Sequence, residues 1–149
     1  MNAMPADELI QLLNRLLEAE RAGARTLAAF LDEYPPQSRA WQELRRVQRD
    51  EASNCKLLID AIRSLGAEPS GATGDFLGKA LAVQGRAARL AFLNRGQGWV
   101  ARKIGEALPR IGAGPLHHML QGMLDSHLVN IAACAALPEV VAENPAPPA

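Results

Sequence analysis

The sequence is poor in aromatic residues and in net charge, and each shortage excludes a class of protein. Aromatic side chains make up only 4% of the 149 residues, too few for the stacking platforms on which single-stranded nucleic acids bind. Lys plus Arg and Asp plus Glu number 16 each, so the formal net charge is zero. A balanced chain has no general attraction for nucleic acid or for an anionic membrane, and we expect neither as a partner.

Long apolar runs and cysteine motifs are also missing. No stretch reaches the roughly 18 consecutive apolar residues of a membrane-spanning helix. The first residues, MNAMPADELIQ, have neither the basic nor the apolar segment of a secretory signal peptide. The two cysteines, Cys55 and Cys134, form no CxxC pair and are interpreted as buried thiols in a reducing compartment. Together these features predict a cytoplasmic protein without a membrane span.

Alanine and leucine are abundant and β-branched residues are few, a composition that favours helix over strand. Helix start and stop signals predict one all-α domain over residues 1–137. Residues 138–149 are rich in proline and are expected to form a disordered tail. The expected long helices run from Pro5 to Glu33, from Ser38 to Leu65, from Arg86 to Leu108 and from Pro115 to Leu137, with a short helix from Phe76 to Val83.

The lengths of the connections predict how the long helices are joined. A short turn containing Tyr34-Pro35-Pro36 links the first two helices, and another at 110–114 links the last two. The connection over residues 67–85 is much longer. This order of short, long and short is typical of a four-helix bundle with one crossover between its second and third helices, as opposed to a simple up-down-up-down bundle.

Each long helix carries a polar residue near the middle of its apolar stripe. These residues are Glu20 in the first helix, Glu51 and Asn54 in the second, Gln97 in the third and His127 in the fourth. Because each lies about halfway along its helix, we expect one polar cluster in the centre of the bundle. A buried carboxylate is costly unless it is paired, hydrogen-bonded or bound to a metal, so these side chains should contact one another or a shared ion.

The first two helices resemble the ferritin-like superfamily, the rubrerythrin- and bacterioferritin-like four-helix bundles. The segment LLEAERAGARTLAAFL is similar to the first helix of that family, with Glu20 at the ligand position. The segment RDEASNCKLLIDAIRSLGAEPS is similar to the Asp-Glu-x-x-His motif of the second helix and to its Ile-x-x-Leu-Gly-x-x-Pro ending. Glu51 matches the ligand there, while Asn54 stands in place of the histidine.

The third and fourth helices depart further from the family pattern. Gln97 and Leu124 stand where the family carries glutamates, and His127 matches a ligand histidine. The resemblance therefore implies a degenerate di-iron site that keeps three of its six ligands: Glu20, Glu51 and His127. The amides and the leucine at the other positions cannot supply the carboxylates that two iron ions need.

Three interpretations of this cluster remain open. It is a working di-iron oxidase centre, or it holds a single iron or zinc ion on Glu20, Glu51 and His127, or it is a metal-free polar core whose hydrogen bonds Asn54 and Gln97 complete. The third is our leading hypothesis. It predicts a bundle without redox chemistry or cofactor, not an enzyme, that acts as an interaction or small-ligand-binding domain. The alternative is a metal-binding protein or a non-haem, metal-dependent oxidoreductase.

Apolar residues outside the core stripe of the first helix predict a homodimer. These are Leu9, Leu12, Leu16 and Phe30, which could supply the dimer face.

Other features of the helices are interpreted as structural. Gly96 and Gly98 flank Gln97 and are interpreted as permitting a close helix approach, with access for a small ligand as the alternative. Arg46 and Asp50, with their charged neighbours, are interpreted as an exposed helix face.

Overall fold

The computed structural model describes residues 2–143, and over this part of the chain every regular element is a helix, with no strand. The all-α prediction is confirmed, and the four long helices lie within two residues of their expected ends. The elements in chain order are α1 (Ala6–Leu31), α2 (Arg39–Ser64), α3 (Phe76–Ala82), α4 (Arg86–Ala107), the 3-10 turn η1 (Leu108–Arg110), α5 (Pro115–Ala135) and α6 (Pro138–Glu143).

Local hydrogen bonds explain where α2 begins and ends. The hydroxyl of Ser38 accepts a hydrogen bond from the backbone N–H of Trp41 at 3.2 Å, which caps the start of the helix. At the other end Gly66 has a φ of +80°, in the left-handed region that favours glycine. The N–H of Ala67 then donates to the carbonyl of Ile62, the bond expected of a Schellman ending.

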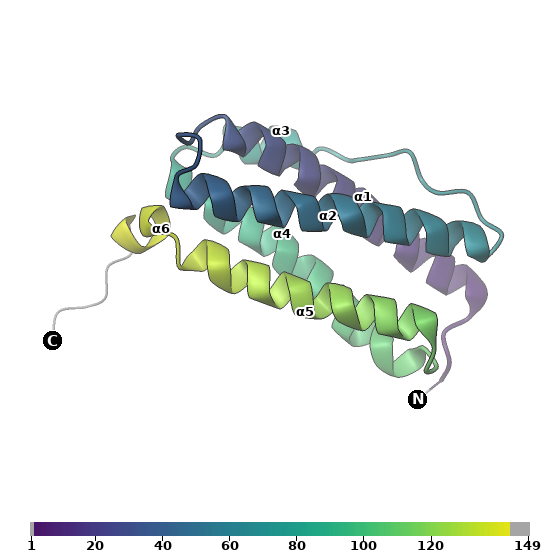
Figure 1. The fold of residues 1–149 in the computed structure, drawn as a ribbon. Coiled ribbons are helices and arrows are strands. Elements are labelled where there is room, and N and C mark those ends of the chain that lie inside the picture. The colour runs from purple at the N-terminus through teal and green to yellow at the C-terminus, as the bar shows by residue number, and fades with distance from the viewer. Residues whose placement is uncertain (1, 144–149) are drawn as a thin grey trace, which may run out of the picture.

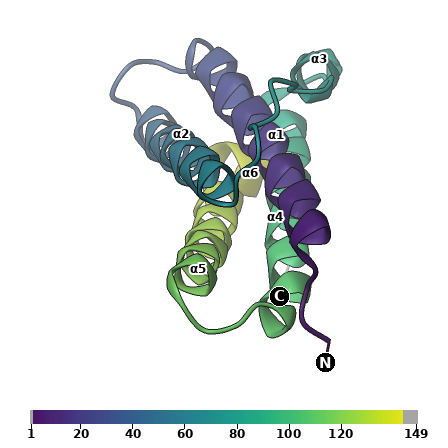
Figure 2. The ribbon, with the colours of Figure 1, turned by 90° about the vertical axis from the view of Figure 1, so that its right-hand side faces the viewer.

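The four long helices pack as two antiparallel pairs. α1 lies against α2 and α4 against α5, and the pairs meet through contacts of α1 with α4 and of α2 with α5 (Figure 1). Seen toward the end of the bundle, the long helices surround a common interior (Figure 2). The connection from α2 to α4 returns along the bundle, and the short α3 within it packs on the outside against α1 and α4.

α1 buries more of its surface than one apolar stripe. Leu16 and Phe30, expected in a dimer face, are 0% and 1% exposed and belong to the core. Leu9 and Leu12 pack partly buried against the core. Leu16 and Phe30 are therefore wrong as members of a dimer face, because α1 has neighbours on more than one side: α2, α3 and α4. A homodimer remains a prediction without this support.

The chain continues past α5 in a further helix. We expected the tail to begin at Pro138, but Pro138–Glu143 forms α6, which contacts α4. Proline suits the first position of a helix because its missing N–H would have no helical partner there. Val140 packs against the apolar cluster that contains Leu137. Residues 144–149, the rest of the expected tail, lie outside the described residues.

Two apolar clusters fill the interior. One contains Leu27, Leu44 and Leu93, and the other contains Leu17 and Leu58. On each long helix the buried polar residue lies between the segments that feed these two clusters. A polar layer therefore crosses the middle of the bundle, as expected. None of the described helices is both long and apolar enough to cross a membrane.

Candidate metal centre

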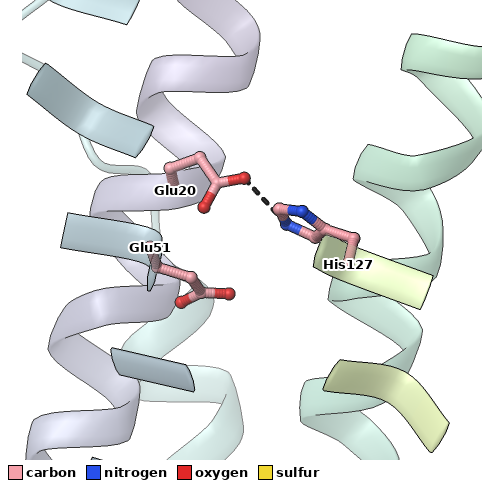
Figure 3. Close-up of side chains that lie close together, drawn as sticks. All are labelled: Glu20, Glu51 and His127. Atoms are coloured by element: carbon pink, nitrogen blue, oxygen red, sulfur yellow. Dashed lines mark ion pairs between the residues drawn. The ribbon is translucent and has the colours of Figure 1, made fainter. Parts of the chain in front are cut away.

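Three titratable side chains from three helices meet in the middle of the bundle (Figure 3). Glu20 comes from α1, Glu51 from α2 and His127 from α5, and they are 1%, 4% and 1% exposed. One ligand atom of each lies within 4.8 Å of the other two. No other group of three His, Cys, Asp or Glu side chains comes this close within residues 2–143. The structure thus brings together the three residues that the sequence selects as ligands.

The two ring nitrogens of His127 have different roles. Nδ1 lies 2.9 Å from the carbonyl oxygen of Met123, and because a carbonyl only accepts, Nδ1 is the donor. In a neutral ring Nε2 then carries a lone pair, yet it lies 2.8 Å from Oε1 of Glu20. The two atoms are at ion-pair distance but do not meet the angles of a directed hydrogen bond. Two acceptors this close are stable only with a proton or another cation beside them.

The pKa values of the centre reflect its burial. Burial lowers the pKa of His127, but the contact with Glu20 and its negative charge outweigh that effect, so the pKa is raised overall. Burial, and then the negative charge of Glu20, raises the pKa of Glu51 well above its usual value. The Glu51 carboxyl therefore holds a proton more tightly than a carboxyl in water does, unless a positive charge replaces it.

Several buried polar atoms of the layer have no hydrogen-bond partner. They are Oε1 and Oε2 of Glu20, Oε2 of Glu51, Nδ2 of Asn54, Oε1 of Gln97 and Nε2 of His127. Folded proteins leave few buried polar atoms unsatisfied, so a cluster of them marks a place where an ion, water or ligand is expected. The expectation that Asn54 and Gln97 complete the hydrogen bonds of the three central side chains is wrong, since Gln97 donates to Asn94 instead.

Gly23, one turn after Glu20 on α1, makes room for the Glu51 carboxylate. A Cβ at position 23 would lie 2.3 Å from Oε2 of Glu51 and 2.8 Å from its carboxyl carbon. A glycine inside a helix costs about 1 kcal/mol relative to alanine, so this one needs a reason. The carboxylate packed against it supplies that reason. Gly23 is not among the residues that the apolar stripes select, although a lone glycine in a run of strong helix formers points to it.

A second polar network links α2 to α5 beside the centre. Arg46 donates to Oδ1 of Asn130 at 2.8 Å, and Asn130 donates to Asp50 at 3.1 Å. Ser126 also donates to Asp50, at 3.2 Å. Asn130 is 1% exposed, whereas its apolar neighbour Ile131 is only half-buried. Arg46 and Asp50 are therefore more than an exposed helix face, because they hold two helices together.

A pocket of about 430 Å³ lies against the centre. Its wall comes from α1, α4, the start of α3 and the segment before it, and it includes Glu51 and Gln97. The ring of Phe76 on α3 packs on Gly96, where a Cβ would lie 3.0 Å from it, so the close-approach interpretation is confirmed at Gly96. A Cβ at Gly98 would meet nothing within 4 Å.

One family model matches residues 7–136, which cover the four long helices except for the first residue of α1, and all three central side chains. The chain belongs to the DUF6306 family. This family is described as a domain of unknown function. Neither the curated proteins nor the solved structures contain a match to this DUF6306 chain. The ferritin-like resemblance therefore stays a prediction, and any role for the DUF6306 centre has to be argued from its own geometry.

Proposed function

We propose that this DUF6306 chain is a ferritin-like bundle that binds one divalent metal ion, iron or zinc, on Glu20, Glu51 and His127. The observation that carries the proposal is the meeting of three buried ligand atoms within 4.8 Å. Nitrogen and oxygen ligands lie about 2.0–2.2 Å from such an ion, so ligands around a tetrahedral ion lie about 3.3–3.6 Å from one another. Side-chain movements on the order of an ångström would bring the three atoms to that spacing.

Charge and hydrogen bonding support a single ion. Two carboxylates balance the charge of one divalent cation, and a neutral histidine completes the set. The hydrogen bond from Nδ1 to the Met123 carbonyl is the outer contact that metal-binding histidines commonly make, and it leaves Nε2 free to bind. Ligands for a second ion are lacking, because Asn54, Gln97 and Leu124 stand at the positions where the resemblance implies the other three ligands.

The ferritin-like part of the proposal rests on the chain path and on one motif. α1 and α2 form one antiparallel pair, α4 and α5 form another, and a long connection joins them, which is the order of a bundle with one crossover. The Asp-Glu pair at 50–51 and the helix ending at Gly66 supply the motif.

A metal-free polar core is the second candidate. The 2.8 Å separation of Glu20 and His127 favours it, because a protonated His127 would form an ion pair there without a metal. In that case the domain is an interaction or small-ligand-binding bundle, as in our leading sequence-based hypothesis. The buried carboxylate oxygens of Glu20 and Glu51 that lack a hydrogen-bond partner support the metal-binding candidate, because a single ion pair with His127 would leave most of them unsatisfied.

Metal titration distinguishes the two candidates. Protein stripped of metal with a chelator is titrated with Zn²⁺, or anaerobically with Fe²⁺, and the bound ion is counted after gel filtration. We expect about one ion per chain, as three protein ligands around one ion imply. Glu20→Gln, Glu51→Gln and His127→Asn should each weaken binding at least about tenfold. Glu106→Gln and His118→Asn, on exposed side chains, are the matched controls.

Two results would count against the single-ion proposal. Unchanged affinity in all three central variants would mean that the ion binds elsewhere, and absence of binding would favour the metal-free core. Two tightly held irons per chain would mean that further ligands exist outside the three central side chains.

A further inference from the structure

The pocket beside the centre is lined by residues of different burial. Glu51 and Gln97 are 4% and 2% exposed, and we call them its buried end, whereas Gly74 and Asp75 are exposed. The rest of the wall is mainly apolar and includes Phe76. A molecule in this pocket therefore meets apolar side chains and two buried polar ones.

The free acceptor at the buried end is Oε1 of Gln97, and a chain of hydrogen bonds fixes its identity. Nδ2 of Asn94 donates to the backbone carbonyl of Ile131 at 3.0 Å, and a carbonyl can only accept. Oδ1 of Asn94 therefore faces Gln97 and accepts from its Nε2 at 3.0 Å. This leaves Oε1 of Gln97 buried without a donor. Oε2 of Glu51 is a second buried oxygen without a partner.

The exposed and half-buried charges of the wall have one sign. Glu18 and Asp75 belong to it, Glu51 adds a buried carboxyl whose pKa is raised, and the wall contains no lysine or arginine. Arg15 and Lys103 lie over the ring of Trp99 at 5.5 and 6.0 Å, but neither belongs to the wall. Such a pocket disfavours anions and accepts neutral or positively charged molecules.

We propose that this pocket binds a small apolar molecule that ends in one hydrogen-bond-donating group, an alcohol or a primary amine, and that carries no negative charge. The donor reaches Oε1 of Gln97 and the apolar body fills the pocket beside Phe76, Leu93 and Val100. A volume of about 430 Å³ is within the range of small-molecule sites. The inference goes beyond the metal ion and does not depend on it, because Gln97 is not one of the proposed ligands.

A matched set of probes with one aromatic body tests the head group. Benzyl alcohol, benzylamine, toluene and benzoate are titrated into the full-length, metal-free protein, with affinities measured by ligand-observed NMR. Benzyl alcohol, benzylamine or both should bind about tenfold more tightly than toluene, because only a donor satisfies the buried acceptor. Benzoate should bind most weakly. A preference for the amine over the alcohol would assign the natural ligand to the amines, and the reverse to the alcohols.

Two variants locate the binding. Gln97→Leu should reduce the preference for the donor probes over toluene to about twofold or less, because the buried acceptor is gone. Ala19→Phe fills the pocket from α1 and should abolish binding. Ala28→Phe, at an exposed position of the same helix, is its control and should bind as the wild type does.

Several results would overturn the inference. These are equal affinity for toluene and benzyl alcohol in the wild type, tighter binding of benzoate, unchanged binding in Ala19→Phe, and no binding of any probe at millimolar concentration. Donor probes that bind equally well to wild type and to His127→Asn, in a protein that takes up no metal, would leave this inference standing and reject the metal proposal.

Discussion

The stability of the metal-free protein should fall as the pH rises, and Glu51 should be a main cause. The pKa of Glu51 is near 4.5 in the unfolded chain and well above that in the folded protein, because of burial and of the charge of Glu20. Between these two values the folded state holds a proton that the unfolded state has released. The stabilising effect of that proton is complete below pH 4.5 and is lost as the pH rises through the folded pKa.

Proton linkage sets the size of the effect. One proton bound by the folded state alone changes the free energy of unfolding by about 1.4 kcal/mol per pH unit. His127, whose pKa is also raised, adds a fall of the same sign above its ordinary value of 6.5. The groups with other resolved shifts titrate outside this range, since the pKa of Glu8 is lowered and the pKa values of Cys55 and Cys134 are about 11.

Glu51→Gln is the perturbation that isolates this contribution. The amide keeps the shape of the side chain but cannot ionise, so the variant's stability should be nearly flat from pH 5 to 6.5. At pH 7 it should be more stable than the wild type by at least about 1 kcal/mol, since each unit of raised pKa corresponds to about 1.4 kcal/mol. The assay is urea unfolding followed by circular dichroism, with chelator present and Glu106→Gln as the control.

Bound metal should oppose this fall of stability with rising pH. Metal binding requires deprotonated ligands, so the stabilisation by saturating Zn²⁺ should grow with pH in the wild type and largely disappear in Glu51→Gln. Parallel stability curves for the metal-free wild type and Glu51→Gln from pH 5 to 7 would refute the reasoning. They would mean that Glu51 does not change its protonation state over that range.

Three further predictions test individual contacts. Gly23→Ala should displace the Glu51 carboxylate and weaken Zn²⁺ binding, measured by calorimetry, about tenfold or more. Gly98 has open space around it, so Gly98→Ala should leave the Zn²⁺ affinity unchanged and stabilise α4 by about 1 kcal/mol. Asn130→Leu should cost about 2–3 kcal/mol in urea unfolding, because it removes the hydrogen bonds that join Arg46 and Asp50 of α2 to α5. A loss below about 0.5 kcal/mol, the usual range of a surface change, would contradict this role. Leu16→Ala should lower the free energy of unfolding by about 2–5 kcal/mol, because it truncates a core side chain. Leu128 is 54% exposed, so Leu128→Ala should change it by less than about 0.5 kcal/mol. Similarly small losses in both variants would mean that Leu16 is not a core residue.

The helices and the polar layer could be predicted because both depend on local patterns. The cap at Ser38 and the stop at Gly66 act within a few residues, so the ends of α2 follow from the sequence. Glu20, Glu51 and His127 interrupt apolar stripes at matching depths, and helix geometry alone then brings them to one level.

Other features depend on which parts of the chain pack together, and these could not be predicted. Phe30 was expected on the dimer face and is instead buried in an apolar cluster that draws on α2 and on α3, α4 and α5, which lie far along the chain from it. Asn130, and not its apolar neighbour Ile131, is buried on α5, on the same face as His127 and Cys134. Asn130 bonds to Arg46 and Asp50 of α2, and no local pattern contains those bonds.

The fit of Glu51 against Gly23 also fixes an order of sequence change. No side chain can be added at position 23 while a glutamate at position 51 keeps its carboxylate there, because even a methyl group would overlap it. A shorter residue at position 51, in contrast, is compatible with glycine at position 23 and creates no steric overlap there. A lineage that gave up this centre would therefore lose Glu51 first and only later gain a larger residue at position 23. Sequences that combine glutamate at 51 with a bulky residue at 23 should be rare, and the pair can serve to recognise family members that keep the centre.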